Sequence, residues 1–532
     1  MNDTPQSGSP TGAQAIVHEL VACGVTAFFS NPGTSEIHLV AAIDETPGAR
    51  AILCLFEGVA TGAADGYARA SGRPAAVLLH LGPGLANGLA NLHNALKARS
   101  PMIVIVGDHA TDHLALDTPL RSDIDSLAKY ASKATYRLKP GEDPRQMVHS
   151  AVTTATSRPA GPVVLVVSAD LMWSAAPRTA PAAKTVDTED DRRFRERTTD
   201  ALIEQAVEAL ARGPKAVMLL GGGLTQRALR LADCIGQITN CRIYCETFNA
   251  RHERGAGIPV AERLPYFQDA LEDRLAGMSS LLLVGSRAPA AFFASPNRTG
   301  QIVQPGVDVV RLPETQSSEE FLALLAARLR APNAPRGAER KELPELSGSI
   351  DAKGIWSVMT RHLPRDSIVS DEAGVTSVGS DAAMQGAEPH VWLNLTGGSI
   401  GQGLPVAVGA AIARSDTPVV AVHGDGGAMY TVQALWTAAR ENARVTIVIF
   451  KNGRYGILDY EAKRHGLGPF GAKGSSMFDL GRPEISWVAI ATGMGVPAMS
   501  ASTVEAFSSA FRSAVATPGP HLIEVVLSGR KS

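Results

Sequence analysis

An aspartate and an asparagine follow two apolar segments in the C-terminal part of the chain. Asp425, in the turn 424–428 (GDGGA), comes after the apolar run 417–422, and Asn452 comes after the apolar run 445–450. If both runs are buried parallel strands with a helix between them, the two side chains emerge at one edge of a sheet. A carboxylate and an amide oxygen suit Mg²⁺, which leaves other positions to water and phosphate oxygens. Glycine N–H groups and a helix N-terminus suit the phosphates, so we predict a site for Mg²⁺ and a diphosphate.

The interval of 27 residues between Asp425 and Asn452 resembles the Gly-Asp-Gly to Asn signature of thiamine diphosphate (ThDP) enzymes. The resemblance implies that Asp425 and Asn452 bind Mg²⁺ through their side chains and Arg454 through its backbone carbonyl. Two ordinary strand-to-helix turns are the simpler alternative. The residues expected to contact the cofactor here are Gly424, Asp425, Gly426, Gly427, Ala428, Asn452 and, through its hydroxyl, Tyr455.

A second chemically informative segment lies near the N-terminus, where Glu57 follows the apolar run 51–56 and opens a helix of small residues. The helix dipole alone favours a carboxylate there. The segment 57–69 (EGVATGAADGYAR) closely resembles the pyrimidine-domain signature of ThDP decarboxylases and acetolactate synthases. In that family the glutamate pairs with N1′ of the aminopyrimidine and promotes removal of the C2 proton of the thiazolium. The resemblance implies that Glu57 activates the cofactor.

Two glycine-containing segments of the C-terminal part also resemble this family. Residues 396–405 (TGGSIGQGLP) match the stretch that holds the cofactor bent, which implies that Ile400 lies between its two rings. The backbone carbonyl of Gly398 would accept from the 4′-amino group. A glycine loop that packs a helix against a sheet is the alternative. Residues 371–375 align with the family's diphosphate-contacting turn, where Gly374 and Val375 would offer backbone N–H donors.

The chain as a whole resembles benzoylformate decarboxylase and acetolactate synthase large subunit-like proteins, and two of its N-terminal segments resemble stretches of benzoylformate decarboxylase. Residues 31–36 (NPGTSE) are similar to an Asn-Pro-Gly-Ser-Asn-Glu stretch, so the Thr34 hydroxyl would donate to the substrate carboxylate. Residues 78–84 (LLHLGPG) are similar to a Leu-His-Ser-Ala-Ala-Gly stretch, which makes His80 a candidate for proton transfer near neutral pH. A histidine in the protein core is the alternative for His80.

The chain departs from benzoylformate decarboxylase where that enzyme has a second active-site histidine. The matching residues 286–293 contain no histidine, and Phe292 or Phe293 could line the pocket instead. His109 and His113 are alternative proton donors, although a surface loop explains them equally well.

The chain also departs from acetolactate synthases and pyruvate decarboxylases. Residues 118–121 (TPLR) replace an Ala-Phe-Gln stretch of acetolactate synthases, which lowers the case for acetolactate synthesis. Arg121 would either bind a substrate carboxylate or be solvated. Leu458 stands where pyruvate decarboxylases place a glutamate, and with Ile457 it predicts an apolar pocket floor.

Strand-like apolar runs alternate with helical patterns, which predicts an α/β protein with parallel sheets covered by helices on both faces. Two segments without a sustained period, 174–193 and 332–348, are predicted linkers. They separate a pyrimidine-binding domain (1–175), a Rossmann-like middle domain (195–330) and a diphosphate-binding domain (350–532). The predicted strands include 25–29, 75–79, 102–106, 163–167, 216–220, 280–284, 307–312, 419–422, 445–450 and 522–526.

The composition is that of an ordinary globular protein, with 532 residues, 45% hydrophobic and 19% charged. The net charge of −2 gives no attraction to nucleic acid or an anionic membrane. No apolar run is long enough to cross a bilayer, and residues 1–12 lack an apolar signal core. Five cysteines without disulfide spacing indicate a reducing cytoplasm. The glycine turn 221–223 is dinucleotide-like, but FAD is not expected.

These features together predict a ThDP- and Mg²⁺-dependent 2-oxo acid decarboxylase, a lyase with carboligase capacity. One alternative is an acetolactate synthase-type transferase that joins two 2-oxo acids. Another is a ThDP-binding regulatory subunit without turnover, against which Glu57, Asp425 and Asn452 argue. The resemblance implies that Glu57 of one subunit meets Asp425 and Asn452 of another. A homodimer or homotetramer that acts on a small 2-oxo acid is therefore expected.

Overall fold

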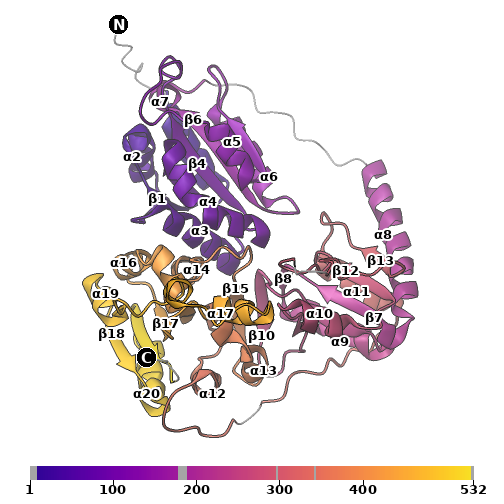
Figure 1. The fold of residues 1–532 in the computed structure, drawn as a ribbon. Coiled ribbons are helices and arrows are strands. Elements are labelled where there is room, and N and C mark those ends of the chain that lie inside the picture. The colour runs from indigo at the N-terminus through magenta and orange to yellow at the C-terminus, as the bar shows by residue number, and fades with distance from the viewer. Residues whose placement is uncertain (1–8, 178–188, 295–297, 341–342, 529–532) are drawn as a thin grey trace.

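The computed structural model describes residues 9–177, 189–294, 298–340 and 343–528. Within these residues the strands form three sheets, in which nearly all neighbouring strands are parallel and helices cover the faces (Figure 1). The predicted α/β class with several parallel sheets is confirmed. Residues 178–188 and 341–342, which belong to the two predicted linkers, lie outside the described residues.

The N-terminal sheet has the order β2-β1-β3-β4-β6-β5, and all of its neighbours are parallel. Alternate side chains of β3 enter different apolar cores: Val77 and Leu79 face one, Ala76 and Leu78 the other. The helices α3 and α4 pack on the first face, and α1, α2 and α6 on the second. The elements are α1 (Gly12–Ala22), β1 (Ala27–Asn31), η1 (Thr34–Glu36), α2 (Ile37–Glu45), β2 (Arg50–Leu53), α3 (Glu57–Ser71), β3 (Ala75–His80), α4 (Leu81–Ala98), β4 (Met102–Asp108), α5 (Ile124–Tyr130), β5 (Ala134–Arg137), α6 (Pro144–Thr156), β6 (Pro162–Ser168) and α7 (Ala169–Trp173).

The middle sheet has the order β11-β9-β7-β12-β13 and is parallel throughout. The central strands β7 and β12 are buried over their whole length, as expected for strands covered on both faces. The elements of this region are α8 (Glu189–Leu210), η2 (Gly213–Lys215), β7 (Ala216–Leu220), β8 (Gly223–Leu224), α9 (Gln226–Thr239), β9 (Arg242–Cys245), β10 (Arg251–Arg254), β11 (Glu262–Arg263), α10 (Gln268–Leu275), β12 (Ser280–Val284), β13 (Asp308–Arg311) and α11 (Ser318–Arg328).

The C-terminal sheet has the order β18-β19-β17-β16-β14-β15-β10-β8. Its strands β10 and β8 come from the predicted middle domain, and β10 runs antiparallel to β15. The elements of this region are α12 (Ala352–His362), β14 (Ile368–Glu372), η3 (Gly374–Ser377), α13 (Ser380–Met384), β15 (His390–Asn394), α14 (Gly403–Ala413), β16 (Val419–Gly424), α15 (Asp425–Ala428), η4 (Met429–Thr431), α16 (Ala434–Arg440), β17 (Val445–Lys451), α17 (Gly456–Arg464), α18 (Ala472–Ser476), α19 (Trp487–Gly493), β18 (Ala498–Ala501), α20 (Val504–Ala516) and β19 (His521–Val526).

The N-terminal and C-terminal sheets meet through α3 and α14, which cross near the middle of the molecule (Figure 1). A Cβ on Gly66 would lie 2.0 Å from the carbonyl oxygen of Val406, and one on Gly409 would lie 1.8 Å from that of Ala63. Only glycine permits so close an approach of two backbones.

A buried ion pair on α3 extends this junction to the middle region. Arg69 lies 3.4 Å from Asp65 and donates to the carbonyl oxygens of Ala250 and Asn394 at 2.7 and 2.9 Å. Asp65 in turn accepts a hydrogen bond of 2.5 Å from the Gln402 amide. The pair therefore links α3 to the middle region, to β15 and to the loop before α14.

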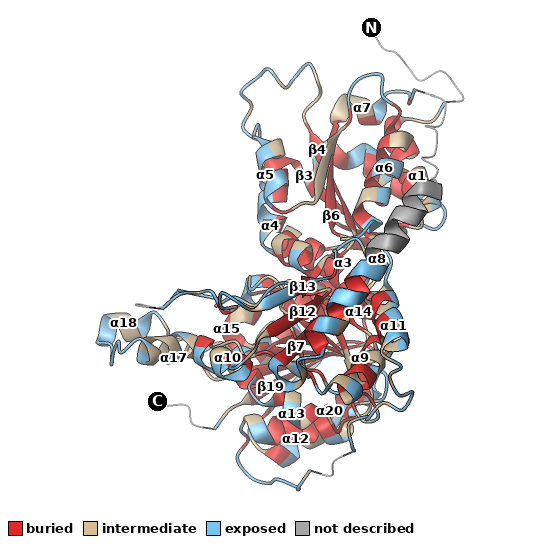
Figure 2. Cartoon of the chain, turned by 90° about the vertical axis from the view of Figure 1, so that its right-hand side faces the viewer, coloured by how far each residue is buried: buried red, intermediate tan, exposed pale blue. Residues whose placement is uncertain are grey.

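The burial pattern agrees with layered α/β domains. The strands are buried, whereas the outer faces of the helices and the segment around α17 and α18 are exposed (Figure 2). In the described part of the chain, no helix has both the length and the apolar character that crossing a lipid bilayer requires.

Two buried histidines on the paired strands β10 and β15 should make the fold sensitive to acid. Burial, reinforced by the positive charge of Arg254, lowers the pKa of His252 and of His390 to about 3. The unfolded chain protonates these side chains near a pKa of about 6.5, whereas the folded chain keeps them neutral. Folding stability is therefore lost as the pH falls below about 6.5, by roughly 2 kcal/mol per histidine at about pH 5.

Replacing His390 by Phe should remove its share of this loss, which denaturant unfolding at about pH 7 and about pH 5 measures. The exposed His38 offers a matched control, because His38→Gln should lose as much stability in acid as the parent chain. An equal acid loss in His390→Phe would contradict the assignment.

Candidate functional site

Asp425 and Asn452 lie at the carboxyl ends of the neighbouring parallel strands β16 and β17. The buried Asp425 carboxylate accepts hydrogen bonds from the N–H groups of Gly426 (3.0 Å) and Gly453 (2.7 Å). The Asn452 Oδ1 atom accepts from the N–H of Arg454 at 2.9 Å. The structure thus brings the predicted Mg²⁺ ligands to one sheet edge, where the Gly453 N–H joins their loops.

The residues of this edge fit a divalent cation with a diphosphate. The donor set consists of a carboxylate, an amide oxygen and backbone carbonyls, which are hard oxygen ligands. A Cβ on Gly424 would meet no atom within 4 Å, so there is open space beside the turn at this residue. Tyr455 packs against the same turn, since a Cβ on Gly426 would lie 2.4 Å from its ring. The Arg454 guanidinium is itself positively charged and pairs with Asp459 at 2.8 Å, so the group that Arg454 would offer to a cation is its backbone carbonyl.

The predicted diphosphate turn also reaches this edge. Strand β14 neighbours β16, with Glu372 opposite His423, and η3 follows β14 with Gly374 and Val375 in its first turn. A Cβ on Gly456 would lie 3.5 Å from Val375 Cγ2, so η3 contacts the start of α17, which follows the Asn452 loop.

The loop before α14 holds an apolar side chain at its surface. Gly398 and Gly401 have φ angles of 76° and 94°, which favour glycine. The loop is fixed to α4, because the Asn94 amide donates to the carbonyl of Ser399 at 2.8 Å and accepts from its N–H at 3.2 Å. Ile400 remains 37% exposed, which suits an apolar support for a flat ligand.

A buried charge pair that the sequence patterns do not reveal lies beneath these loops. The Glu372 carboxylate accepts from the N–H groups of Gly401 (2.6 Å) and Gly403 (2.7 Å), and lies 3.3 Å from His423 Nε2. Burial alone would raise the pKa of Glu372 and lower that of His423, but their attraction reverses both shifts. Because His423 directly precedes Gly424, the pair joins the Ile400 loop to the Asp425 turn.

Glu57 and His80 flank the first turn of α4. Glu57 is the first residue of α3, and its Oε2 accepts from the Asn87 amide at 3.1 Å. A Cβ on Gly84 would lie 3.5 Å from both Glu57 Oε1 and His80 Cβ. The structure therefore places the predicted cofactor-activating carboxylate and the predicted proton-transfer histidine side by side.

The ring of His80 contacts the carboxylate of Glu36, to which no sequence motif assigned a role. Its Nδ1 lies 2.8 Å from Glu36 Oε2, and the His80 side chain is 23% exposed whereas that of Glu36 is fully buried. Burial raises the pKa of Glu36 despite the opposing attraction of His80. The same oxygen accepts from the Gly33 N–H at 3.0 Å. The predicted substrate contact Thr34 is exposed in the same turn, η1.

The other polar candidates lie in the loop after β4. The rings of His109 and His113 are 5.7 Å apart. The Arg121 guanidinium donates to the carbonyl oxygens of Leu114 and Ser122, both at 3.1 Å. Arg121 therefore stabilises its own loop through these two hydrogen bonds, and its carboxylate-binding role stays a prediction.

Phe292 belongs to an aromatic cluster of the middle region, with ring centroids 5.4 Å from Phe248 and 4.8 Å from Tyr266. Phe293 is 68% exposed. The cluster extends to α17 through the Phe267–Tyr460 contact of 4.4 Å. The cluster thus joins the middle region to α17, the helix that carries Ile457 and Leu458, the predicted apolar floor of the pocket.

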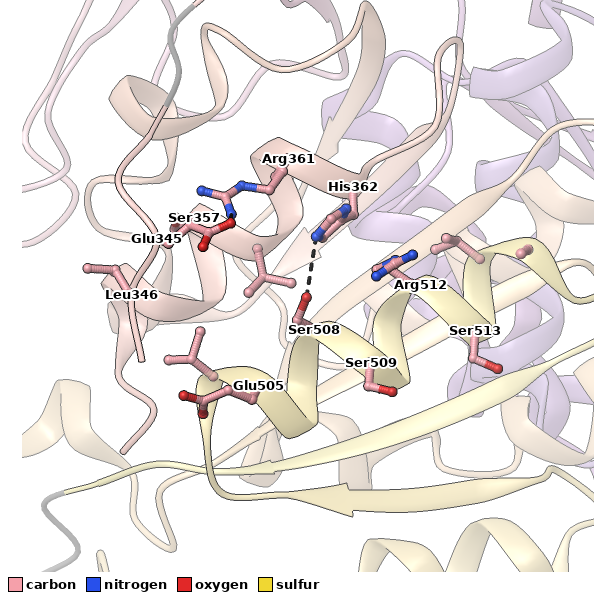
Figure 3. Close-up of a pocket in the computed structure, with 14 residues that line it drawn as sticks. Glu345, Leu346, Ser357, Arg361, His362, Glu505, Ser508, Ser509, Arg512 and Ser513 are labelled. Carbon is pink, nitrogen blue, oxygen red and sulfur yellow. Dashed lines mark hydrogen bonds and ion pairs between the residues drawn. The ribbon is translucent and has the colours of Figure 1, made fainter. Parts of the chain in front are cut away.

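A cavity of about 900 Å³ lies between α12 and α20 (Figure 3). His362 Nε2 lies 3.3 Å from Ser508 Oγ across it, and Arg361 and Arg512 contribute to its wall. It contains none of the predicted site residues and is separate from the sheet edge that carries Asp425.

Both ends of the chain match models of one protein family. Residues 10–129 match "Thiamine pyrophosphate enzyme, N-terminal TPP binding domain", and residues 373–525 match the corresponding C-terminal TPP binding domain. The chain belongs to the thiamine pyrophosphate (ThDP) enzyme family. The predicted family is thereby confirmed, and Glu57 and His80 lie inside the first match and Asp425 and Asn452 inside the second.

Relatives cover nearly the whole chain. It is 46% identical to "Putative acetolactate synthase large subunit IlvX" of Mycobacterium tuberculosis, over 97% of this chain and 99% of the relative. It is 29% identical to benzoylformate decarboxylase of Pseudomonas aeruginosa, over 94% of this chain and 96% of the relative. Among solved structures, 4-hydroxybenzoylformate decarboxylase of Rhodococcus jostii RHA1 is similar, with 25% identity, a TM-score of 0.79 and coverage of 97% and 99%. The chain is thus related to both acetolactate synthases and benzoylformate decarboxylases.

Glu372→Gln should weaken ThDP binding by at least about tenfold, or about 1.4 kcal/mol. The change removes the counter-charge of the buried His423 and one acceptor that orders the Ile400 loop. Fluorescence titration of the full chain with ThDP at saturating Mg²⁺ measures this effect.

Glu505→Gln is the matched control, because Glu505 is exposed at the start of α20 and should leave the affinity unchanged. Equal ThDP affinity in Glu372→Gln and the parent chain would contradict a role for the charge pair in ordering the cofactor loops.

Proposed function

We propose that the chain is a ThDP- and Mg²⁺-dependent decarboxylase of 2-oxo acids with carboligase capacity. One observation carries the proposal: Glu57 Oε1 and His80 Cβ both lie 3.5 Å from the position of a Cβ on Gly84, and His80 is paired with Glu36. A decarboxylase needs one group to activate the cofactor and another to return a proton to the carbon that loses CO₂. The two sets of side chains match these tasks.

The C-terminal residues would hold the cofactor. Asp425 and Asn452 through their side chains, and Arg454 through its carbonyl, would bind Mg²⁺. Gly398 and Ile400 would support the bent cofactor. The N–H groups of the 424–428 turn and of η3, with the Tyr455 hydroxyl, would contact the diphosphate. When bound, ThDP supplies a nucleophilic carbon and an electron sink for decarboxylation.

The N-terminal residues would manage protons and the substrate. Glu57 would hold a proton at N1′ of the aminopyrimidine, and the Thr34 hydroxyl would donate to the substrate carboxylate. Since His80 Nδ1 is engaged by Glu36, its Nε2 is the ring nitrogen left to deliver a proton. Loss of CO₂ followed by addition of one proton to the same carbon gives an aldehyde.

The substrate side chain is proposed to be apolar. Ile457 and Leu458 lie in the first turn of α17, which begins four residues after Asn452, and Leu458 is 41% exposed. An apolar floor favours a branched or aromatic 2-oxo acid over a small polar one.

An acetolactate synthase-type transferase is the second candidate, favoured by the name of the 46% identical relative. In that reaction the carbon that has lost CO₂ would bond to the carbonyl carbon of a second 2-oxo acid instead of taking up a proton. The two candidates share every residue assigned to the cofactor and differ in the task of His80.

The active unit is proposed to be a homodimer or homotetramer, in which Glu57 of one subunit meets Asp425 and Asn452 of another. Apolar side chains exposed around the cofactor loops support a covering partner: Ile400 (37%), Met429 (39%), Tyr430 (54%) and Leu458 (41%). A cytoplasmic location is also proposed, because all five cysteines are unpaired.

The products distinguish the two candidate reactions. We expect NMR of the chain with Mg²⁺, ThDP and benzoylformate to show an aldehyde, and pyruvate to give little acetolactate. His80→Ala should lower the decarboxylation rate by about 10²- to 10⁴-fold, because it removes the proton donor.

Acetolactate as the main product would contradict the decarboxylase proposal in favour of the second candidate. A His80→Ala rate equal to that of the parent chain would remove the proton-transfer role. His18→Ala is a suitable control, because His18 is exposed on α1 and lies outside the residues assigned to the cofactor and substrate.

A further inference from the structure

Three side chains of types that can ligate a metal ion lie together on the face of the N-terminal sheet opposite α3 and α4. Glu19 and Cys23 come from the end of α1, and His149 comes from α6, which packs beside α1 (Figure 2). One ligand atom of each residue lies within 4.8 Å of the others. Cys23 Sγ is 3.7 Å and His149 Nδ1 is 4.0 Å from the same Glu19 oxygen, Oε1.

These distances are somewhat longer than those that a tetrahedral zinc ion imposes. Zinc bonds of about 2.3 Å to sulfur and about 2.0–2.2 Å to nitrogen and oxygen place ligand atoms about 3.3–3.6 Å apart. Closing the site would shorten the Cys23–Glu19 distance by a few tenths of an ångström and the His149–Glu19 distance by about 0.6 Å, and would draw Cys23 and His149 together from within 4.8 Å. The His149 side chain is 63% exposed, so its ring is free to make this adjustment.

The end of α1 places the Glu19 and Cys23 side chains together. Glu19 and Cys23 are four residues apart and therefore share one helix face. The N–H of Cys23 donates to the Glu19 carbonyl at 2.9 Å, and Gly24, with φ 84°, ends the helix. The carboxyl end of a helix also favours a positive charge. A cation at Cys23 would thus meet both the side-chain ligands and the helix dipole.

We propose that Glu19, Cys23 and His149 form a Zn²⁺ site that joins α1 to α6, with water as the fourth ligand. Binding replaces the S–H bond of Cys23 with an S–Zn bond and releases one proton to solvent. A thiolate and an imidazole favour Zn²⁺ over Mg²⁺, so the site differs in chemistry from the oxygen ligands at Asp425. The proposal is independent of the reaction that the chain catalyses.

Cobalt(II) titration of the full chain tests this site, with ThDP and Mg²⁺ saturating so that the oxygen site is filled. We expect a thiolate-to-cobalt charge-transfer band and tetrahedral ligand-field bands that saturate at one equivalent per chain, with Zn²⁺ displacing the cobalt. Cys23→Ser should abolish the charge-transfer band, and His149→Gln should weaken cobalt binding by about tenfold or more.

His18→Gln is the matched control, because His18 is exposed on the same helix and outside the cluster, and it should leave the spectrum unchanged. Unaltered ThDP binding by Cys23→Ser would show that this variant is folded. The absence of a charge-transfer band in the parent chain, or its persistence in Cys23→Ser, would overturn the proposal.

Discussion

The close contact of α3 with α14 is the constraint on which the rest of the structure depends. Each helix presents a glycine to the backbone of the other, so the two helices cannot slide without a clash. Helix α3 begins at Glu57, and α14 begins directly after the Ile400 loop. One packing contact therefore fixes the N-terminal functional residues and the C-terminal cofactor loops to a common frame. The small residues of segment 57–69 allow the backbones of α3 and α14 to come close together, and Glu57 is the first residue of α3.

Two buried ion pairs add further links between the segments that meet at this contact. Arg69 with Asp65 and His423 with Glu372 are each buried, and each pair also hydrogen-bonds to backbone groups of other segments. A buried charge without such partners would be strongly destabilising. Gly401 and Gly403, which donate to Glu372, and Gln402, which donates to Asp65, belong to or adjoin the Ile400 loop, so the energetic requirement to satisfy these charges also orders that loop. The charge pairs act as positioning groups for residues that the cofactor would touch.

The sequence predicted the parts of the fold that local patterns encode. The apolar runs 216–220 and 280–284 coincide with β7 and β12, and the run 445–450 lies within β17. The family was also predictable, because the motifs around Glu57 and Asp425 have characteristic spacing. The short strands β8 and β10 were not predicted as part of the C-terminal sheet. Their pairing with β15 is a long-range contact, and four residues such as 251–254 (RHER) show no apolar pattern.

The partners of the site residues were equally hidden. Glu36 and His80 are 44 residues apart, and no local signal connects a glutamate in one turn with a histidine at the end of another strand. Glu372 lies in a segment that resembled a diphosphate turn, yet its carboxylate reaches the Ile400 loop and His423. Sequence motifs thus indicated which residues would touch the cofactor, whereas only the three-dimensional structure shows which residues hold them.

The central claim is that Glu57 activates a cofactor held by the C-terminal residues. Parallel measurement of ThDP affinity and turnover in Glu57→Gln tests it most directly. The account predicts that ThDP and Mg²⁺ still bind, because Asp425 and Asn452 are intact, while turnover falls by about 10²-fold or more. Turnover equal to that of the parent chain would contradict the account.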